Sequence, residues 1–432
     1  MIKQNLEIVE YLEIEGGISL KGTVEISGAK NAALPNMAAT LLTDEEIILE
    51  NVPDLLDVKT MKELLSFIGY SIENISEKTF SFKQETINSL VAPYELVSKM
   101  RASILVLGPM LSRFKHAKVA LPGGCSIGTR PVDLHLSALE KMGANIKVEH
   151  GYIIAKAPNG LKGASINFEK ITVTGTENIM MAAVLADGET VITNAAREPE
   201  VVDLAKMLKK MGAKIEGEGT PTIRIQGVKK LHGTKHKIIP DRIEAGTFAV
   251  LSALFDGNIT IKNYPLEYLE FVNKKLADIG IHVVPIGKNE VIIKREKILK
   301  PTTIETKEYP YFPTDLQAQF MTLLSVVDGL SSITENIFEN RFMHVPELER
   351  LGADIKVKDR TAFIRGVKKL TGAEVKATDL RASAAMVIAG LIAEGTTRIY
   401  DIYHLDRGYE NIDEKLKKLG AKLRRDVIER TL

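Results

Sequence analysis

The sequence predicts an α/β protein made of two similar domains, each built from three copies of one repeat. A helical stretch that ends in a hydrophobic residue and glycine, followed by strand-like alternation, recurs six times at intervals of about 70 residues. A second, alanine-rich helical stretch precedes each copy, and its small side chains extend around most of its surface. One such unit cannot bury its apolar helix and its sheet face alone, so two groups of three units are expected.

The elements of the repeat follow in order along the chain. The marker glycines lie where a helix end needs a left-handed residue, and they are Gly69, Gly143, Gly212, Gly280, Gly352 and Gly420. Buried helices are expected within residues 29–42, 100–111, 176–188, 242–257, 314–329 and 379–395. Short β-branched runs predict strands at 45–51, 189–194, 258–263 and 396–401, with hairpin strands at 150–158 and 360–367. The repeat is therefore helix, strand, helix, strand, often with a further hairpin.

We expect one domain to comprise residues 1–28 plus 239–432 and the other residues 29–238. The basic, glycine-containing stretch 229–237 is the predicted hinge. The segment through about Ser27 is expected to pair with the second domain, so that the chain crosses twice between the domains. A cleft between domains is the usual place for a small-molecule site.

Composition excludes several classes of function. Lysine and arginine number 57 against 56 for aspartate and glutamate, a net charge of +1, which argues against a nucleic-acid or membrane-surface partner. Glu7, Glu10 and Glu13 interrupt any signal-peptide core, and no apolar run approaches a membrane span. The single cysteine and the absence of an export signal predict a cytoplasmic protein. With no HExxH or CxxC pattern among its residues, the chain is expected to use no metal.

Chemistry is concentrated in two features. The only cysteine, Cys125, lies in a glycine-rich loop at 121–131, and Arg130 follows five positions later, where a cation favours the thiolate. Polar side chains also stand near the starts of the buried helices, and these are Lys30, Arg101, Glu177, Arg242, Asp315 and Arg381. A cation at a helix start opposes the helix dipole. The lysine and the three arginines of this set therefore predict a polyanionic ligand.

From about Leu20 to the C-terminus the chain resembles the UDP-N-acetylglucosamine 1-carboxyvinyltransferase family of the EPSP synthase superfamily. The Cys125 loop and several long motifs carry the resemblance, and these motifs occupy residues 27–35, 130–144, 195–204, 312–320, 339–348, 377–385 and 404–412. The first dozen residues look like a family-variable extension. The resemblance implies two inverted, prism-like α/β barrel domains of three βαβαββ units each, with the active site in the cleft between them.

The implied reaction transfers the enolpyruvyl group of phosphoenolpyruvate to the 3-hydroxyl of UDP-N-acetylglucosamine and releases phosphate, in the first committed step of peptidoglycan synthesis. No metal or organic cofactor is implied. The resemblance makes Cys125 the general acid, able to form a covalent phosphoenolpyruvate adduct and to react with fosfomycin. It makes Asp315 the candidate base that contacts the attacking hydroxyl.

The resemblance also assigns binding residues. Those implied for phosphoenolpyruvate are Lys30, Asn31, Arg130, Arg341, Arg381 and Arg407. Those implied for the nucleotide sugar are Arg101, Arg130, Pro131, Val132, Asp133, Leu134, Lys170, Thr172, Val173, Asp315 and Ile337. Some family members have a lysine where this chain has Leu56, so no phosphate role is assigned to that segment.

Three other functions compete with this one. The sister transferase that acts on shikimate 3-phosphate shares the fold but lacks the cysteine loop. An RNA 3′-phosphate cyclase is more distant, and the balanced charge and the missing histidine signature speak against it. A non-catalytic nucleotide-sugar sensor could retain the cleft, but Lys30, Cys125, Asp315 and Arg407 are all present. Phosphate release from the two substrates distinguishes these functions.

Overall fold

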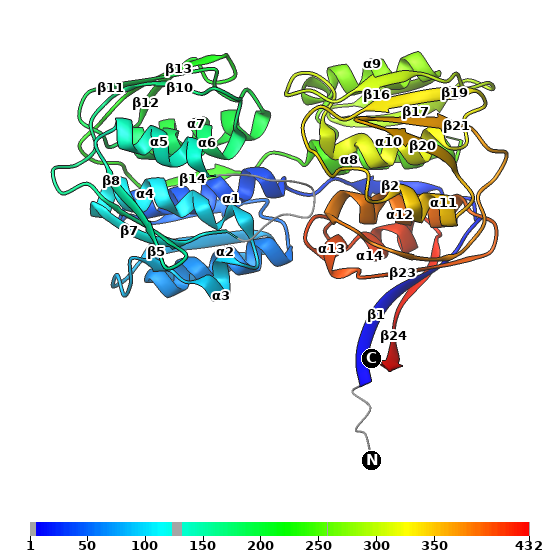
Figure 1. The fold of residues 1–432 in the computed structure, drawn as a ribbon, viewed down its shortest axis with the longest axis horizontal. Coiled ribbons are helices and arrows are strands. Elements are labelled where there is room, and N and C mark those ends of the chain that lie inside the picture. Colours follow the sequence, from blue (N-terminus) through cyan, green and yellow to red (C-terminus); the bar gives the residue numbers. More distant parts are fainter. Residues whose placement is uncertain (1–5, 123–131, 257, 432) are drawn as a thin grey trace. The chain divides into compact units, whose positions relative to one another are not determined.

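The structure is a computed structural model, and it describes residues 6–122, 132–256 and 258–431. These residues form two compact units (Figure 1). Unit 1 contains the chain through Ser27 and from Pro240 onward, and unit 2 runs from Gly28 to Ile239. Each unit has its own hydrophobic core.

Unit 2 contains three four-stranded sheets with one common strand order. The first sheet is β14 (Thr234–Lys237), β3 (Ile47–Glu50), β5 (Thr79–Gln84) and β4 (Tyr70–Ser76). The second is β6 (Val91–Ala92), β7 (His116–Ala120), β9 (Tyr152–Lys156) and β8 (Asn145–Glu149). The third is β10 (Ser165–Asn167), β11 (Glu189–Thr193), β13 (Thr222–Gln226) and β12 (Lys214–Glu216). In each sheet the first two strands are parallel and the other pairs are antiparallel.

Unit 1 repeats this arrangement. Its first sheet is β22 (Glu374–Lys376), β23 (Thr396–Tyr400), β1 (Leu6–Glu15) and β24 (Lys422–Thr431). The second is β2 (Gly22–Glu25), β15 (Ile259–Lys262), β17 (Glu290–Arg295) and β16 (Ile281–Gly287). The third is β18 (Thr303–Glu305), β19 (Leu330–Thr334), β21 (Thr361–Arg365) and β20 (Asp354–Lys358). Together the six sheets confirm the predicted fold class, in which each domain contains three βαβαββ units.

The predicted alanine-rich helices form the centre of each unit. In unit 2 they are α1 (Lys30–Ala39), η2 (Arg101–Val106) with α4 (Leu107–Phe114), and α6 (Val173–Ala183). In unit 1 they are α8 (Arg242–Leu254), α10 (Gln317–Leu324) and α12 (Leu380–Ile392). Every residue of α8 except Leu254 is buried. Small side chains allow such close approach on all sides, which explains why these helices lack a polar stripe.

The second helix of each repeat is amphipathic and ends one or two residues before the marker glycine. These helices are α2 (Leu56–Ile68), α5 (Asp133–Lys141), α7 (Pro199–Lys210), α9 (Glu270–Ile279), α11 (Val345–Arg350) and α14 (Ile412–Lys418), and the short α3 (Tyr94–Val97) and α13 (Tyr403–Asp406) lie outside the pattern. All six marker glycines have positive φ, between 90° and 130°. The prediction of left-handed helix ends is confirmed.

Three of the six repeats are completed by strands from elsewhere in the chain. β14 supplies the first strand of the sheet that contains β3, and β2 pairs in parallel with β15 although unit 2 lies between them in the sequence. β1 inserts between β23 and β24. The prediction that the N-terminal segment pairs with the second domain is therefore confirmed.

The two chain crossings lie side by side. The Ala29 amide donates to the Ile239 carbonyl at 2.8 Å, and the Asp241 amide donates to the Ser27 carbonyl at 2.8 Å. Gly28 approaches the backbone of Asn51 so closely that a Cβ there would lie 1.8 Å from the Asn51 carbonyl oxygen. Only glycine fits this crossing.

The predicted hinge at residues 229–237 is wrong. Most of its second half is strand β14, which pairs with β3 and belongs to unit 2. His236 is buried between the exposed Lys235 and Lys237, and its Nε2 lies 3.0 Å from Asp203 Oδ1. The alternation of a strand was present in this basic stretch, but its composition was interpreted as a linker.

Candidate active site

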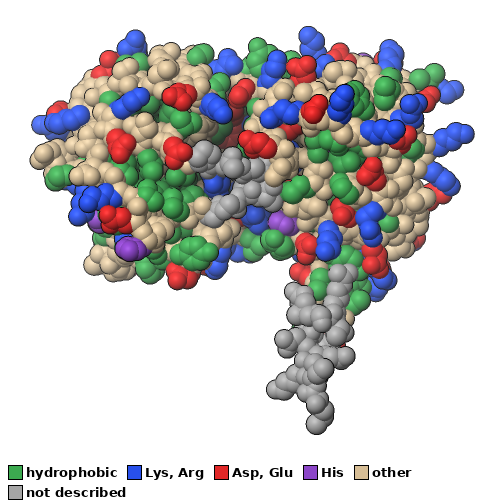
Figure 2. All heavy atoms as spheres, in the orientation of Figure 1, with side chains coloured by type: hydrophobic (Ala, Val, Ile, Leu, Met, Phe, Trp, Pro, Cys, Tyr) green, Lys and Arg blue, Asp and Glu red, His purple; other side chains and the backbone are tan. Residues whose placement is uncertain are grey.

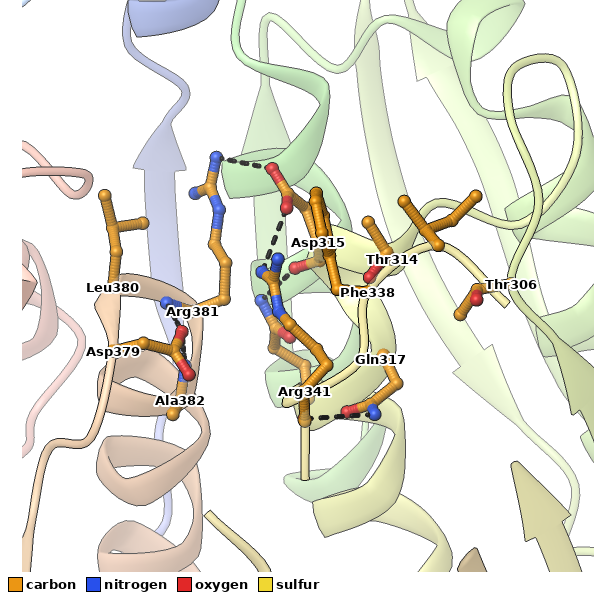
Figure 3. A network of polar contacts seen from close by, with 12 residues as sticks. Thr306, Thr314, Asp315, Gln317, Phe338, Arg341, Asp379, Leu380, Arg381 and Ala382 are labelled. Carbon is orange, nitrogen blue, oxygen red and sulfur yellow. Dashed lines mark hydrogen bonds and ion pairs between the residues drawn. The ribbon is translucent and has the colours of Figure 1, made fainter. Parts of the chain in front are cut away.

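In unit 1 one carboxylate lies between two buried guanidinium groups. Asp315 belongs to the turn η4 (Thr314–Leu316), which leads into α10. Its Oδ1 accepts a hydrogen bond from Arg341 Nη2 at 3.0 Å, and its Oδ2 lies 3.3 Å from Arg381 Nη2. The two arginines reach it from different segments (Figure 3). The Asp315 side chain is 26% exposed and those of Arg341 and Arg381 are 6% and 4% exposed, so the carboxylate is the accessible member.

The position of Arg381 follows from the start of α12. The N-cap residue Asp379 accepts hydrogen bonds from the amides of Arg381 and Ala382 at 2.8 and 3.1 Å. Burial opposes the charge of Arg381, but Asp315 is the first of several neighbours that raise the pKa of its guanidinium above the ordinary value. Its Nη1 is buried and has no hydrogen-bond partner among the described residues. This buried donor could bind an anionic ligand, because leaving it unpaired costs about 1–3 kcal/mol.

The other predicted residues of unit 1 lie on loops or helix ends. Arg341 follows β19, and its guanidinium lies 5.4 Å from the centre of the Phe338 ring. Ile337 is half-buried in the same loop. Arg407 is half-buried at the end of α13. The pKa of His404 is lowered first by the burial of its imidazole and then by the positive charge of Arg407.

In unit 2, Lys30 is the first residue of α1 and is nearly buried. Its Nζ lies 2.9 Å from Asp57 Oδ2, and the two residues are 8% and 4% exposed. Asn31, beside it, is exposed. Sequence reasoning missed Asp57, which lies next to Leu56 in the segment that was assigned no role. Its only signal was an acidic residue in the first turn of α2, where acidic residues are common.

A buried imidazole follows the predicted sugar-binding residue Leu134 in unit 2. His135 in α5 lies 3.1 Å from Asn178 Nδ2 and 3.3 Å from Thr174 Oγ1. Burial, and then the charge of half-buried Arg101, lowers the pKa of His135 to about 4. Sequence reasoning did not single out this histidine, because its burial depends on helix packing.

The remaining predicted residues of unit 2 surround the starts of α5 and α6. Thr172 caps α6 by accepting a hydrogen bond from the Gly175 amide at 3.1 Å. Of the others, Val132 is buried, Leu134 and Val173 are half-buried, and Asp133 and Lys170 are exposed. Cys125, Arg130 and Pro131 lie outside the described residues.

Glu177 does not stand at a helix start as the sequence predicted. It lies in the second turn of α6 and is buried. Burial, followed by the charges of Glu200 and Glu198, raises the pKa of Glu177 well above its ordinary value. Burial therefore disfavours its charged form, and Glu177 does not belong with the charged groups at the helix ends.

The described residues contain no group of three or more His, Cys, Asp or Glu side chains placed to hold a metal ion. In the same part of the chain, no helix has the length and apolarity to cross a membrane. Figure 2 shows basic and acidic side chains interspersed on the visible surface of each unit.

Comparisons with known proteins identify the family. The family model described as EPSP synthase (3-phosphoshikimate 1-carboxyvinyltransferase) matches residues 14–416. A UDP-N-acetylglucosamine 1-carboxyvinyltransferase from Koribacter versatilis is 55% identical over 415 residues, which cover 95% of both chains. One from Campylobacter hominis is 54% identical over 419 residues, which cover 96% of this chain and 99% of the relative.

Solved structures agree on the fold. The enolpyruvyl transferase NikO from Streptomyces tendae superposes with a TM-score of 0.88 at 25% identity, covering 98% of this chain and 100% of that one. EPSP synthase from Acinetobacter baumannii gives a TM-score of 0.75 at 18% identity, covering 97% and 100%, and shows the fold alone. The chain is thus a carboxyvinyltransferase: it belongs to the enolpyruvyl transferase family that includes EPSP synthase, on the branch of the UDP-N-acetylglucosamine 1-carboxyvinyltransferases.

Proposed function

We propose that this chain transfers the enolpyruvyl group of phosphoenolpyruvate to the 3-hydroxyl of UDP-N-acetylglucosamine and releases phosphate. The main support is Asp315, an accessible carboxylate held by two buried arginines, one of which has a buried donor without a partner among the described residues. The names of relatives more than 50% identical support the choice of acceptor. Because the nucleotide sugar is a charged, water-soluble precursor, we place the reaction in the cytoplasm.

The reaction needs a base that takes the proton of the sugar hydroxyl and an acid that gives a proton to C3 of phosphoenolpyruvate. In the addition step, the sugar oxygen bonds to C2 of phosphoenolpyruvate, its proton passes to a base, and C3 gains a proton from an acid. In the elimination step, C3 loses a proton and the C2–O bond to phosphate breaks, which restores the double bond. We assign Asp315 as the base and Cys125 as the acid. The Cys125 sulfur can also add to C2 while its proton moves to C3, which gives a covalent adduct.

Anion binding would change the surroundings of Asp315. Arg341 and Arg381 direct N–H groups at its carboxylate, and we also assign them to phosphoenolpyruvate. A bound phosphate or carboxylate competes for those N–H groups, because planar guanidinium binds both kinds of anion. Substrate binding therefore releases carboxylate oxygens of Asp315, which can then accept the proton of the sugar hydroxyl.

The proposal also assigns the remaining contacts of the two substrates. Phosphoenolpyruvate is bound by Lys30, Asn31, Arg130, Arg341, Arg381 and Arg407. The nucleotide sugar is bound by Arg101, Arg130, Pro131, Val132, Asp133, Leu134, Lys170, Thr172, Val173, Asp315 and Ile337. The buried Lys30–Asp57 ion pair holds the lysine side chain at the start of α1.

Phosphate release tests the proposal. The full chain is incubated with phosphoenolpyruvate and either UDP-N-acetylglucosamine or shikimate 3-phosphate, and the product is analysed by mass. We expect phosphate release when the acceptor is the nucleotide sugar and none when it is shikimate 3-phosphate. The reverse result would identify the sister enzyme. Cys125→Ala should be about 10²–10⁴-fold slower because it lacks the acid. Cys125→Asp, the matched control, retains a proton donor and should keep more activity. Full activity in the alanine variant would remove Cys125 from the mechanism.

A further inference from the structure

Glu335 is a buried carboxylate that the reaction does not use directly. It follows the last residue of β19, and it is 1% exposed. A buried carboxylate is costly unless hydrogen bonds satisfy it. The partners of Glu335 are therefore informative, and they fall into two groups.

One group belongs to the loop after β19. Glu335 Oε1 accepts hydrogen bonds from the amides of Ile337 at 2.9 Å and Phe338 at 3.1 Å. The Phe338 ring in turn lies beneath the Arg341 guanidinium. The backbone of Glu335 is fixed as well, because its amide donates to the Arg360 carbonyl at 2.8 Å and its carbonyl accepts from Arg360 Nε at 2.7 Å.

The other group leads to the turn that carries Asp315. Glu335 Oε2 accepts a hydrogen bond from the hydroxyl of Thr314 at 2.8 Å, and Thr314 directly precedes Asp315. Oε1 also accepts from the hydroxyl of Thr306 at 2.9 Å, and the Thr306 oxygen accepts from the Asn336 amide at 2.8 Å. Thr306 and Thr314 lie on the side of Asp315 away from Arg381 (Figure 3).

We propose that Glu335 is a positioning residue that fixes Asp315 relative to the loop of Ile337 and Arg341; this rests on the proposed function. Its carboxylate accepts from four donors and links two segments that each carry predicted site residues. An ionised carboxylate is acceptor-only, which matches four donors. Without it, the turn and the loop would lose their shared anchor, and the general base and the sugar contact would move independently.

Two substitutions at Glu335 separate positioning from general stability. Glu335→Ala leaves four donors without their acceptor, and small displacements of a catalytic group can cost up to about a hundredfold. We expect kcat to fall about 10–100-fold and KM for the nucleotide sugar to rise. Glu335→Gln retains one acceptor oxygen for the loop amides, and the Thr314 hydroxyl can rotate to accept from the new amide. It should restore most of both parameters.

Thr314→Val tests one side of the anchor only. It removes the contact to the Asp315 turn and leaves the loop contacts of Glu335 in place. We expect kcat to fall by a larger factor than KM for the nucleotide sugar rises, because Asp315 is displaced while the Ile337 loop keeps its anchor. Ser331→Ala is the matched control, because Ser331 on β19 is a buried acceptor whose bond, from the Thr302 amide at 3.1 Å, leads to no predicted site residue.

The measurements are kcat and KM of the full chain from phosphate release, with thermal melting to check folding. An inactive wild type would refute the proposed function itself, and the positioning role of Glu335 would fall with it. If the wild type is active, a folded Glu335→Ala with unchanged kcat and KM would overturn the positioning role. If Glu335→Ala does not fold, Thr314→Val decides: a fall in kcat that is larger than the rise in KM supports the role, and any other result overturns it. Equal losses in Ser331→Ala would also overturn it.

Discussion

The charged residues of the candidate site form ion pairs in which the cationic side chains are buried. Asp315 is held by Arg341 and Arg381, and Lys30 is held by Asp57. Breaking such a pair leaves an uncompensated buried charge, which is strongly destabilising. The site can therefore hold cations ready for an anionic substrate without exposing them to water.

The buried His135 predicts a pH effect on stability. The unfolded chain protonates this imidazole near its ordinary pKa of 6.5, whereas the folded protein does so near pH 4. Between these values the unfolded state binds more protons, so the contribution of His135 is complete above about pH 6.5 and falls by about 3 kcal/mol on acidification to pH 4.

His135→Gln removes this titration and can still bond to Asn178 and Thr174. The loss of melting temperature between pH 7 and pH 5 should be smaller than in the wild type, as measured by circular dichroism. His150→Gln, which removes an exposed imidazole in the same unit, serves as the control. An identical acid loss in wild type and His135→Gln would exclude His135 as the cause.

Among the elements, α12 combines a structural start with a site residue. Asp379 accepts hydrogen bonds from two first-turn amides, and one of these belongs to Arg381. Asp379→Ala should cost about 1 kcal/mol through loss of the cap, and turnover should fall because Arg381 loses its fixed position.

Asp379→Asn is the matched variant, since asparagine also provides a capping oxygen. Its unfolding free energy should stay within a few tenths of a kcal/mol of the wild-type value. Chemical denaturation of both variants measures the difference. Equal stability of Asp379→Ala and Asp379→Asn would show that the cap is not what stabilises the start of α12.

The sequence predicts elements well where the signal is local. The alanine-rich helices and the marker glycines depend on side-chain size and backbone handedness within one repeat, and both are confirmed. The Lys30–Asp57 pair spans 27 residues and the Thr306–Glu335 contact spans 29. Such contacts depend on how helices and strands pack, which periodicity does not report. The misplaced hinge has a different origin, because the strand alternation of β14 was present in the sequence but short, and its pairing with β3 is long-range.

At the scale of the whole molecule, unit 1 depends on its first strand. Tyr11–Glu15 pairs with β23 on one side and with β24 on the other, and Leu12 and Ile14 are fully buried. Glu13 bonds to Arg398 at 2.7 Å and to Arg424 at 3.1 Å. Residues 6–10 pair with β24 alone.

A chain that begins at residue 16 should therefore fail to fold unit 1, since burial of Leu12 and Ile14 contributes about 3–6 kcal/mol. A chain that begins at Tyr11 keeps these residues and should melt close to the wild type. Circular dichroism and limited proteolysis of the two truncations make the comparison. Cooperative wild-type melting of the shorter chain would refute this role of β1.

The pairing of β1 with strands near the C-terminus also delays the folding of unit 1 during synthesis. Glu13 and its partner Arg398 are 385 residues apart, so a ribosome adding about 5–20 residues per second needs about 20–80 s to supply the strand that β1 joins. The described residues of unit 2 all lie between Gly28 and Ile239, so this unit can fold while the rest is still being translated. During that interval Leu12 and Ile14, which are fully buried in the folded chain, lack the strands that cover them and stay exposed on the nascent chain.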